Sequence, residues 1–162
     1  MEKIKITNSI EPLTANFRAV EFWAPKFRGR IDFEIPKCLV EGAQIIRDFF
    51  GPTLITSTIR PKDKFGYHQS GNAIDLLPLE ETLVNIKKFE NECRLYQSSK
   101  NSELIIKLRE VGVEGFLIES SNCIHLDFRN QVNCASTDKF GKYIVCEWHN
   151  DGSKFGKSNV IY

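Results

Sequence analysis

The sequence predicts a single α+β domain in which helices pack on a mainly antiparallel sheet. Its 162 residues, of which 41% are hydrophobic, are enough to bury one core. Apolar residues recur at helical spacing over 36–50, whereas apolar and polar residues alternate over 123–128, as in a strand with one buried face. We therefore expect residues 1–162 to form one domain, without internal repeats.

Three helices are expected from the apolar spacing. The first spans about residues 36–50 and is followed by Gly51 and Pro52, which end it. The second lies between about residues 80 and 97, and the third runs from about 102 to 111. The apolar stripe of the first helix is expected to cover the sheet.

Alternation and β-branched residues predict strands over four further ranges: 53–58, 115–119, 123–128 and 143–148. The second and third of these are expected to form a hairpin across 120–122. A polar loop over 61–66 precedes His68. His149 is expected at the end of the strand over 143–148. A turn at 150–152 and a returning strand to the C-terminus are expected after it.

Two segments with alternating side chains carry acidic and imidazole groups on one face. Asp75 lies on the polar face of a short strand, and His125 shares the polar face of another strand with Asp127. Two adjacent strands of this kind would aim Asp75 and His125 into the same space. His68 would reach that space from the preceding loop.

These residues predict a catalytic zinc site. Two imidazoles and one carboxylate, from His68, His125 and Asp75, leave a fourth position for water, whereas a structural site needs four protein ligands. Zinc polarises a carbonyl oxygen and lowers the pKa of its bound water to ~7. The expected chemistry is hydrolysis of an amide or ester.

The His-x-x-Gly-x-Ala-x-Asp run over 68–75, followed by a His-x-Asp strand, resembles the D-alanyl-D-alanine metallopeptidases, whose fold the Hedgehog signalling domain shares. The resemblance covers about residues 17–129, beginning at a short element, 17–22, that is similar to one opening many phage and bacterial members. It implies that His68, Asp75 and His125 bind Zn²⁺. It also implies that Arg60, which ends a Ser-x-x-Arg strand, helps to hold the substrate.

The general base is the point at which the sequence departs from this family. Many members carry Glu or Asp three residues before the last His, where this chain has Asn122. Glu119, six residues before His125, has a spacing similar to that in the Hedgehog domain, and it is our first candidate for the base. Asp127 is the second candidate, although it is more simply a group that orients an imidazole.

Each of these residues also has a simpler interpretation. A His-x-Asp strand alone is more often a polar strand face than a site, and Arg60 is equally well explained as a solvated residue before Pro61. Glu119 is equally well a carboxylate at the end of a hairpin. Cys123 and Cys134 would have to join His125 to make a structural zinc site, but their spacing matches no common zinc ribbon.

The charge and the cysteine content limit the possible binding partners and the cellular compartment of the protein. The net charge of +1 provides no broad positive field for nucleic acid. The chain has 5 cysteines, an odd number without a Cys-x-x-Cys pair, which favours synthesis in a reducing compartment. No signal peptide and no membrane span are expected, so the chain is expected to be made in the cytoplasm.

The resemblance supplies the expected substrate. It implies a zinc peptidase that cleaves the peptide part of peptidoglycan, as a carboxypeptidase or an endopeptidase, in a phage or a bacterium. It would then reach the cell wall through lysis or as part of a virion. The alternative is a module that keeps zinc for stability, as the Hedgehog domain does, and binds a partner without catalysis; Asn122 favours this alternative.

Overall fold

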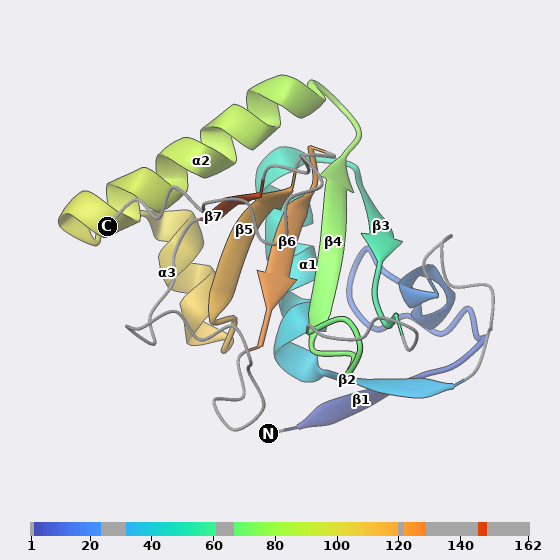
Figure 1. Cartoon of the computed structure of the whole chain (residues 1–162). Coiled ribbons are helices and arrows are strands. Elements are labelled where there is room, and N and C mark those ends of the chain that lie inside the picture. The colour runs from blue at the N-terminus through green and yellow to red at the C-terminus, as the bar shows by residue number, and fades with distance from the viewer. Residues whose placement is uncertain (1, 24–31, 61–66, 120–121, 129–145, 149–162) are drawn as a thin grey trace.

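The computed structural model describes residues 2–23, 32–60, 67–119, 122–128 and 146–148 (Figure 1). In this part of the chain, one sheet has the strand order β3-β4-β6-β5-β7 and a smaller sheet pairs β1 with β2. The strands are β1 (Lys3–Ile6), β2 (Phe33–Pro36), β3 (Thr53–Ser57), β4 (Ala73–Pro78), β5 (Gly115–Glu119), β6 (Ile124–Asp127) and β7 (Cys146–Trp148).

The helices follow the predicted spacing closely. They are the 3₁₀ helix η1 (Ala19–Phe22) and the α-helices α1 (Lys37–Phe50), α2 (Thr82–Ser99) and α3 (Glu103–Glu110). Gly51 adopts a φ of 80° directly after α1, a conformation that glycine adopts without strain, so the helix ends there. Ser102 accepts a hydrogen bond at the start of α3 from the backbone N–H of Ile105 (3.1 Å).

The large sheet is antiparallel except at one edge. β3, β4, β6 and β5 pair antiparallel in that order, and β5 and β6 form the predicted hairpin. β7 joins the edge of β5 in parallel. The predicted α+β fold with a mainly antiparallel sheet is confirmed, and only residues 146–148 of the expected strand over 143–148 lie within the described part.

One face of the sheet packs against α1, which lies behind the sheet in Figure 1. The hydrophobic core joins this face of the sheet to the helices and includes Leu39, Ala43, Ile46, Ile55, Ile74, Leu76, Phe89, Leu104, Leu108, Phe116, Ile124 and Leu126. In strands β4 and β6 the alternate residues Asp75 and His125 therefore point to the opposite face. The side of these two strands that faces away from α1 carries the polar groups.

The sheet of β1 and β2 was not expected from the sequence. Ile4 pairs with Ile35 and Ile6 pairs with Phe33, and Ile6 and Ile35 are fully buried. Each strand is only four residues long, so its alternation is too short to be distinguished from a loop by sequence alone. No helix in the described residues is long and apolar enough to cross a membrane.

Candidate functional site

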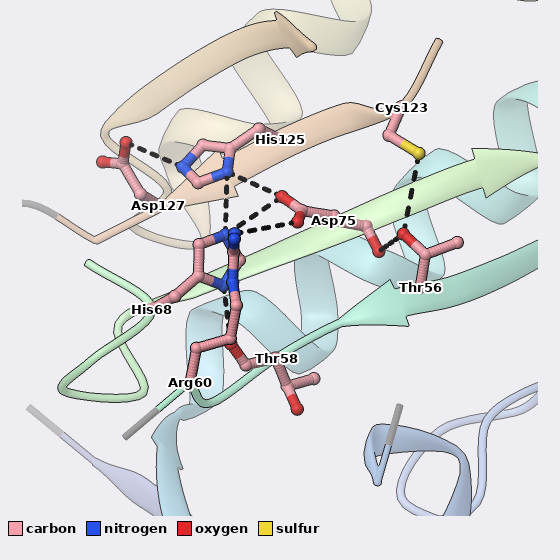
Figure 2. A network of polar contacts seen from close by, with 8 residues as sticks. All are labelled: Thr56, Thr58, Arg60, His68, Asp75, Cys123, His125 and Asp127. Atoms are coloured by element: carbon pink, nitrogen blue, oxygen red, sulfur yellow. Dashed lines mark hydrogen bonds and ion pairs between the residues drawn. The ribbon is translucent and has the colours of Figure 1, made fainter. Parts of the chain in front are cut away.

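The sheet register places Asp75 and His125 directly opposite each other. β4 and β6 pair antiparallel, and Asp75 is the partner of His125 in that register. Side chains of directly opposed residues lie on the same face, about 4.5–5.5 Å apart at Cβ. The expectation that two adjacent strands aim these side chains into the same space is confirmed (Figure 2).

His68 reaches the same space from a tight turn before β4. The backbone N–H of Asn72 donates to the carbonyl of Tyr67 (2.8 Å), and the N–H of Gly71 donates to the carbonyl of His68 (3.3 Å). Gly71 adopts a φ of 73°, and a Cβ at this position would lie 2.9 Å from the backbone oxygen of Glu34. The glycine in the His-x-x-Gly run is therefore required by the backbone conformation and by its contact with β2.

Three potential ligand atoms converge to form a small triangle. His125 Nδ1 lies 2.8 Å from Asp75 Oδ1, His68 Nε2 lies 3.1 Å from the same oxygen, and the two nitrogens are 3.2 Å apart. The three residues are buried, with exposed fractions of 6% for His68, 3% for Asp75 and 4% for His125. The three distances between these atoms are close to the separation of about 3.3 Å that two ligand atoms have around a tetrahedral zinc ion.

The outer nitrogen of each imidazole has a partner that orients the ring. His68 Nδ1 lies 2.6 Å from the backbone carbonyl oxygen of Thr58, which can only accept, so Nδ1 donates and Nε2 is the ring nitrogen that faces the site. His125 Nε2 lies 3.4 Å from Asp127 Oδ2, whose negative charge favours a proton on Nε2. This contact leaves His125 Nδ1 as the atom that faces Asp75.

The charges in the cluster are strongly coupled. Burial alone would lower the pKa of His125, but the carboxylates of Asp127 and Asp75 outweigh burial and raise this pKa to about 10. Burial alone would raise the pKa of Asp75, but its contacts with His125 and His68 hold this pKa well below its usual range. Without a metal, the site therefore keeps Asp75 ionised and a proton on His125.

Arg60 belongs to this cluster and is not only a solvated residue at a strand end. Its guanidinium Nη2 lies 3.3 Å from Asp75 Oδ2, so the two oxygens of this carboxylate face different partners. The backbone N–H of Arg60 also donates to the carbonyl of His68 (2.8 Å). With 35% of its side chain exposed, Arg60 stands between the buried cluster and solvent.

A β-bulge in β3 helps to hold the Asp75 backbone. Ile55 pairs with Leu76 and Ser57 pairs with Asp75, so Thr56 is the extra residue of the bulge. The Thr56 hydroxyl donates to the backbone carbonyl of Asp75 (3.3 Å). Sequence reasoning missed Thr56 and the Thr58 carbonyl, because a backbone acceptor carries no side-chain signal and a bulge depends on the partner strand.

Of the two candidates for the general base, the structure describes the side chain of Asp127 but not that of Glu119. Asp127 is buried beside His125. Glu119 is the last residue of β5, one position beyond the pair of Ile118 with Ile124, and its side chain lies outside the described part. Asn122 is exposed and has a φ of 58°, a left-handed conformation that asparagine tolerates, so its identity suits the turn of the hairpin.

The cysteines of the alternative zinc site, which the sequence spacing disfavoured, are Cys123 and Cys134. Cys123 is buried, and its Sγ lies 3.6 Å from the Thr56 hydroxyl oxygen. Cys134 lies outside the described residues. Among the described residues, the group able to hold a metal ion consists of His68, Asp75 and His125, without a cysteine.

Comparisons of this chain with models of protein families, with curated proteins and with solved structures find no match.

The residues present fit a divalent metal by their donor chemistry. Two imidazole nitrogens and a carboxylate oxygen are ligands typical of zinc. His68 Nε2 and Asp75 Oδ1 lie 3.1 Å apart, so a cation between them would be within reach of an imidazole nitrogen and of a carboxylate oxygen at once. Burial of all three groups strengthens the attraction to such a cation.

Proposed function

We propose that this domain is a zinc-dependent peptidase that hydrolyses peptide bonds in the stem or cross-link peptides of peptidoglycan. The observation that carries the metal part of this proposal is the convergence of His68 Nε2, Asp75 Oδ1 and His125 Nδ1 within 2.8–3.2 Å of one another. The substrate part rests on the resemblance of the sequence motifs to D-alanyl-D-alanine metallopeptidases.

Zinc, when bound by these three side chains, supplies a Lewis acid that polarises the scissile carbonyl and makes water a better nucleophile at neutral pH. The residues of the chain provide the remaining functions. Thr58 and Asp127 fix the imidazole orientations, and Arg60 holds the second oxygen of Asp75. Glu119 is the proposed general base, with Asp127 as the second candidate.

Arg60 is also the proposed contact for the substrate. A guanidinium is a planar fork of N–H donors that suits a carboxylate, and the side chain of Arg60 is 35% exposed. Stem peptides of peptidoglycan end in a carboxylate. The partly exposed Arg60 would then join the terminal carboxylate to the buried metal cluster.

The test is hydrolysis by purified protein loaded with one equivalent of zinc. Pentapeptide stems ending in D-alanyl-D-alanine and cross-linked muropeptides are incubated with it, and the products are resolved by mass spectrometry. Free D-alanine identifies a carboxypeptidase, and opened cross-links identify an endopeptidase. Activity that disappears on chelation, returns with zinc and is absent in His125→Ala supports the proposal; cleavage that survives chelation contradicts it.

One observation favours a second function, a zinc-stabilised binding module without catalysis. Asn122, at the position of the usual base, has no carboxylate and lies exposed in a left-handed turn. Such a module binds zinc and loses stability on chelation, because the metal stabilises the folded state by mass action. Zinc binding without cleavage of any stem peptide favours this function over the peptidase.

A further inference from the structure

Gly115 occupies a position in β5 where its own backbone does not require glycine. It is the first residue of the strand, and its φ lies outside the left-handed region in which glycine is favoured. Glycine lacks a side chain to pack and has more conformational freedom to lose, so it weakens a strand relative to other residues. The reason for a glycine must therefore come from a neighbouring group.

That neighbour is the carboxyl group of Asp127. Gly115 and Asp127 are directly opposed in the β5–β6 register. A Cβ at position 115 would overlap with Cγ, Oδ1 and Oδ2 of Asp127, all three atoms of the carboxyl group. The carboxyl group thus occupies the space that a side chain at position 115 would fill.

The position of this carboxyl group determines its contact with His125. Asp127 is fully buried, and its Oδ2 lies 3.4 Å from Nε2 of His125, two residues earlier on the same face of β6. Figure 2 shows Asp127 on one side of this imidazole and Asp75 on the other. A methyl group at position 115 would displace the carboxylate from this place, and Nε2 would lose the negative charge that orients the ring.

We propose that Gly115 is a positioning residue for the metal site, which it serves by leaving space for Asp127 to orient His125. The inference rests on the proposed zinc site and adds a residue that does not contact the metal. Loss of a group that orients a metal-ligating imidazole typically costs about 10- to 100-fold in metal affinity. Gly115→Ala should therefore weaken zinc binding by about this factor, as should Asp127→Ala.

The test is a double-mutant cycle in zinc affinity, measured by competition with a chelator of known affinity. Gly115→Ala is compared in the parent and in Asp127→Ala, where the carboxyl group that it would displace is absent. We expect the large loss only in the parent, and a change within about twofold in the Asp127→Ala background. Equal losses in both backgrounds, or parent-like affinity of Gly115→Ala, would overturn the inference.

Folding controls separate this role from general destabilisation. Gly42→Ala crowds the core, because its Cβ would lie 3.0 Å from Val113 Cγ2 and 3.1 Å from Leu126 Cδ1, without contacting Asp127. This variant should keep zinc affinity whichever way its stability changes, because alanine favours helix α1 relative to glycine while its methyl group crowds the core. Should Gly115→Ala fail to fold, the double variant Gly115→Ala/Asp127→Ala is expected to fold again while binding zinc weakly; a double variant that also fails contradicts the inference.

Two further measurements test whether Gly115 acts through Asp127, one by protein stability and the other by the geometry of the metal site. Urea unfolding with chelator present should show that Gly115→Ala destabilises the parent but not Asp127→Ala; additive effects contradict the inference. With cobalt in place of zinc, both single variants should change the visible absorption bands in the same way, and unlike changes contradict it. A parent without zinc affinity overturns the proposed function and this inference with it, whereas a parent that binds zinc and shows no coupling overturns only the inference.

Discussion

Asp75 and His125 face each other across β4 and β6, and Asp75 Oδ1 lies 2.8 Å from His125 Nδ1. The same oxygen lies 3.1 Å from His68 Nε2, while the other carboxylate oxygen faces Arg60. Asp75 is therefore the centre of the cluster, in contact with both imidazoles and the guanidinium. Changes to this cluster, and to the turn that carries His68, should therefore have measurable effects.

Removal of any of the three converging side chains should abolish stoichiometric zinc binding. The parent is expected to bind one Zn²⁺, and His68→Ala, Asp75→Ala and His125→Ala are expected to bind none, because two remaining ligands do not hold the ion. Elemental analysis after gel filtration measures the stoichiometry. His149→Ala is the matched control, and a parent without zinc after refolding in its presence contradicts the prediction.

Zinc affinity should rise with pH well beyond the range of an ordinary histidine. The pKa of His125 is raised to about 10, so a proton competes with zinc for Nδ1 throughout the neutral range. The logarithm of the apparent affinity should increase by about one per pH unit from about pH 7 to 9. Titrations with competing chelator at several pH values measure this slope; a plateau above about pH 7 would show an ordinary histidine pKa.

At alkaline pH, the stability of the metal-free protein should fall as the pH rises, whereas its zinc affinity should increase. The raised pKa of His125 contributes stability that is present below about pH 6.5 and lost as the pH rises through about 10. The lowered pKa of Asp75 contributes stability that is present above about pH 4 and lost on further acidification. Urea unfolding with chelator present should therefore show these groups stabilising most between about pH 4 and 6.5.

Arg60→Lys should retain zinc but lower turnover. A lysine keeps one positive charge near Asp75 Oδ2, whereas it lacks the planar fork that binds a carboxylate bidentately. Zinc content and the rate of muropeptide hydrolysis are measured on the same preparation. Arg18→Lys, a substitution in the N-terminal segment, serves as the control. Parent-like hydrolysis by Arg60→Lys would show that Arg60 does not bind the substrate and only contacts Asp75.

Glu119→Gln should remain folded and zinc-loaded but lose about 10²- to 10⁴-fold in rate, as expected on removal of a general base. The amide of glutamine cannot accept a proton from water at neutral pH, although it preserves the size of the side chain. Single-turnover hydrolysis measures the effect. Full activity in Glu119→Gln, together with loss in Asp127→Asn, would transfer the role to Asp127.

Gly71→Ala should destabilise the fold by about 1–3 kcal/mol, because alanine at a φ of 73° is strained and its Cβ would lie 2.9 Å from the Glu34 carbonyl oxygen. Chemical unfolding of Gly71→Ala and of the parent measures this loss, and a parent-like unfolding midpoint for Gly71→Ala would contradict the prediction.

The sequence by itself determined the local structure and the polar faces of the strands. Alternation with a period of two is a local property, so it predicts that Asp75 and His125 lie on the faces opposite the core before any pairing is known. Helical spacing predicts α1 for the same reason, because the 3.6-residue repeat depends only on neighbours in the chain.

Only the tertiary structure decided which groups complete the site. The contact of Arg60 with Asp75 joins residues 15 apart, and that between the two imidazoles joins residues 57 apart. Both depend on strand order and register. Sequence reasoning assigned no role to Gly115, because the overlap of its Cβ position with Asp127 exists only when β5 and β6 pair in one register. A one-residue shift in that register would turn these side chains to the other face, so register is the physical reason that the site follows from the fold.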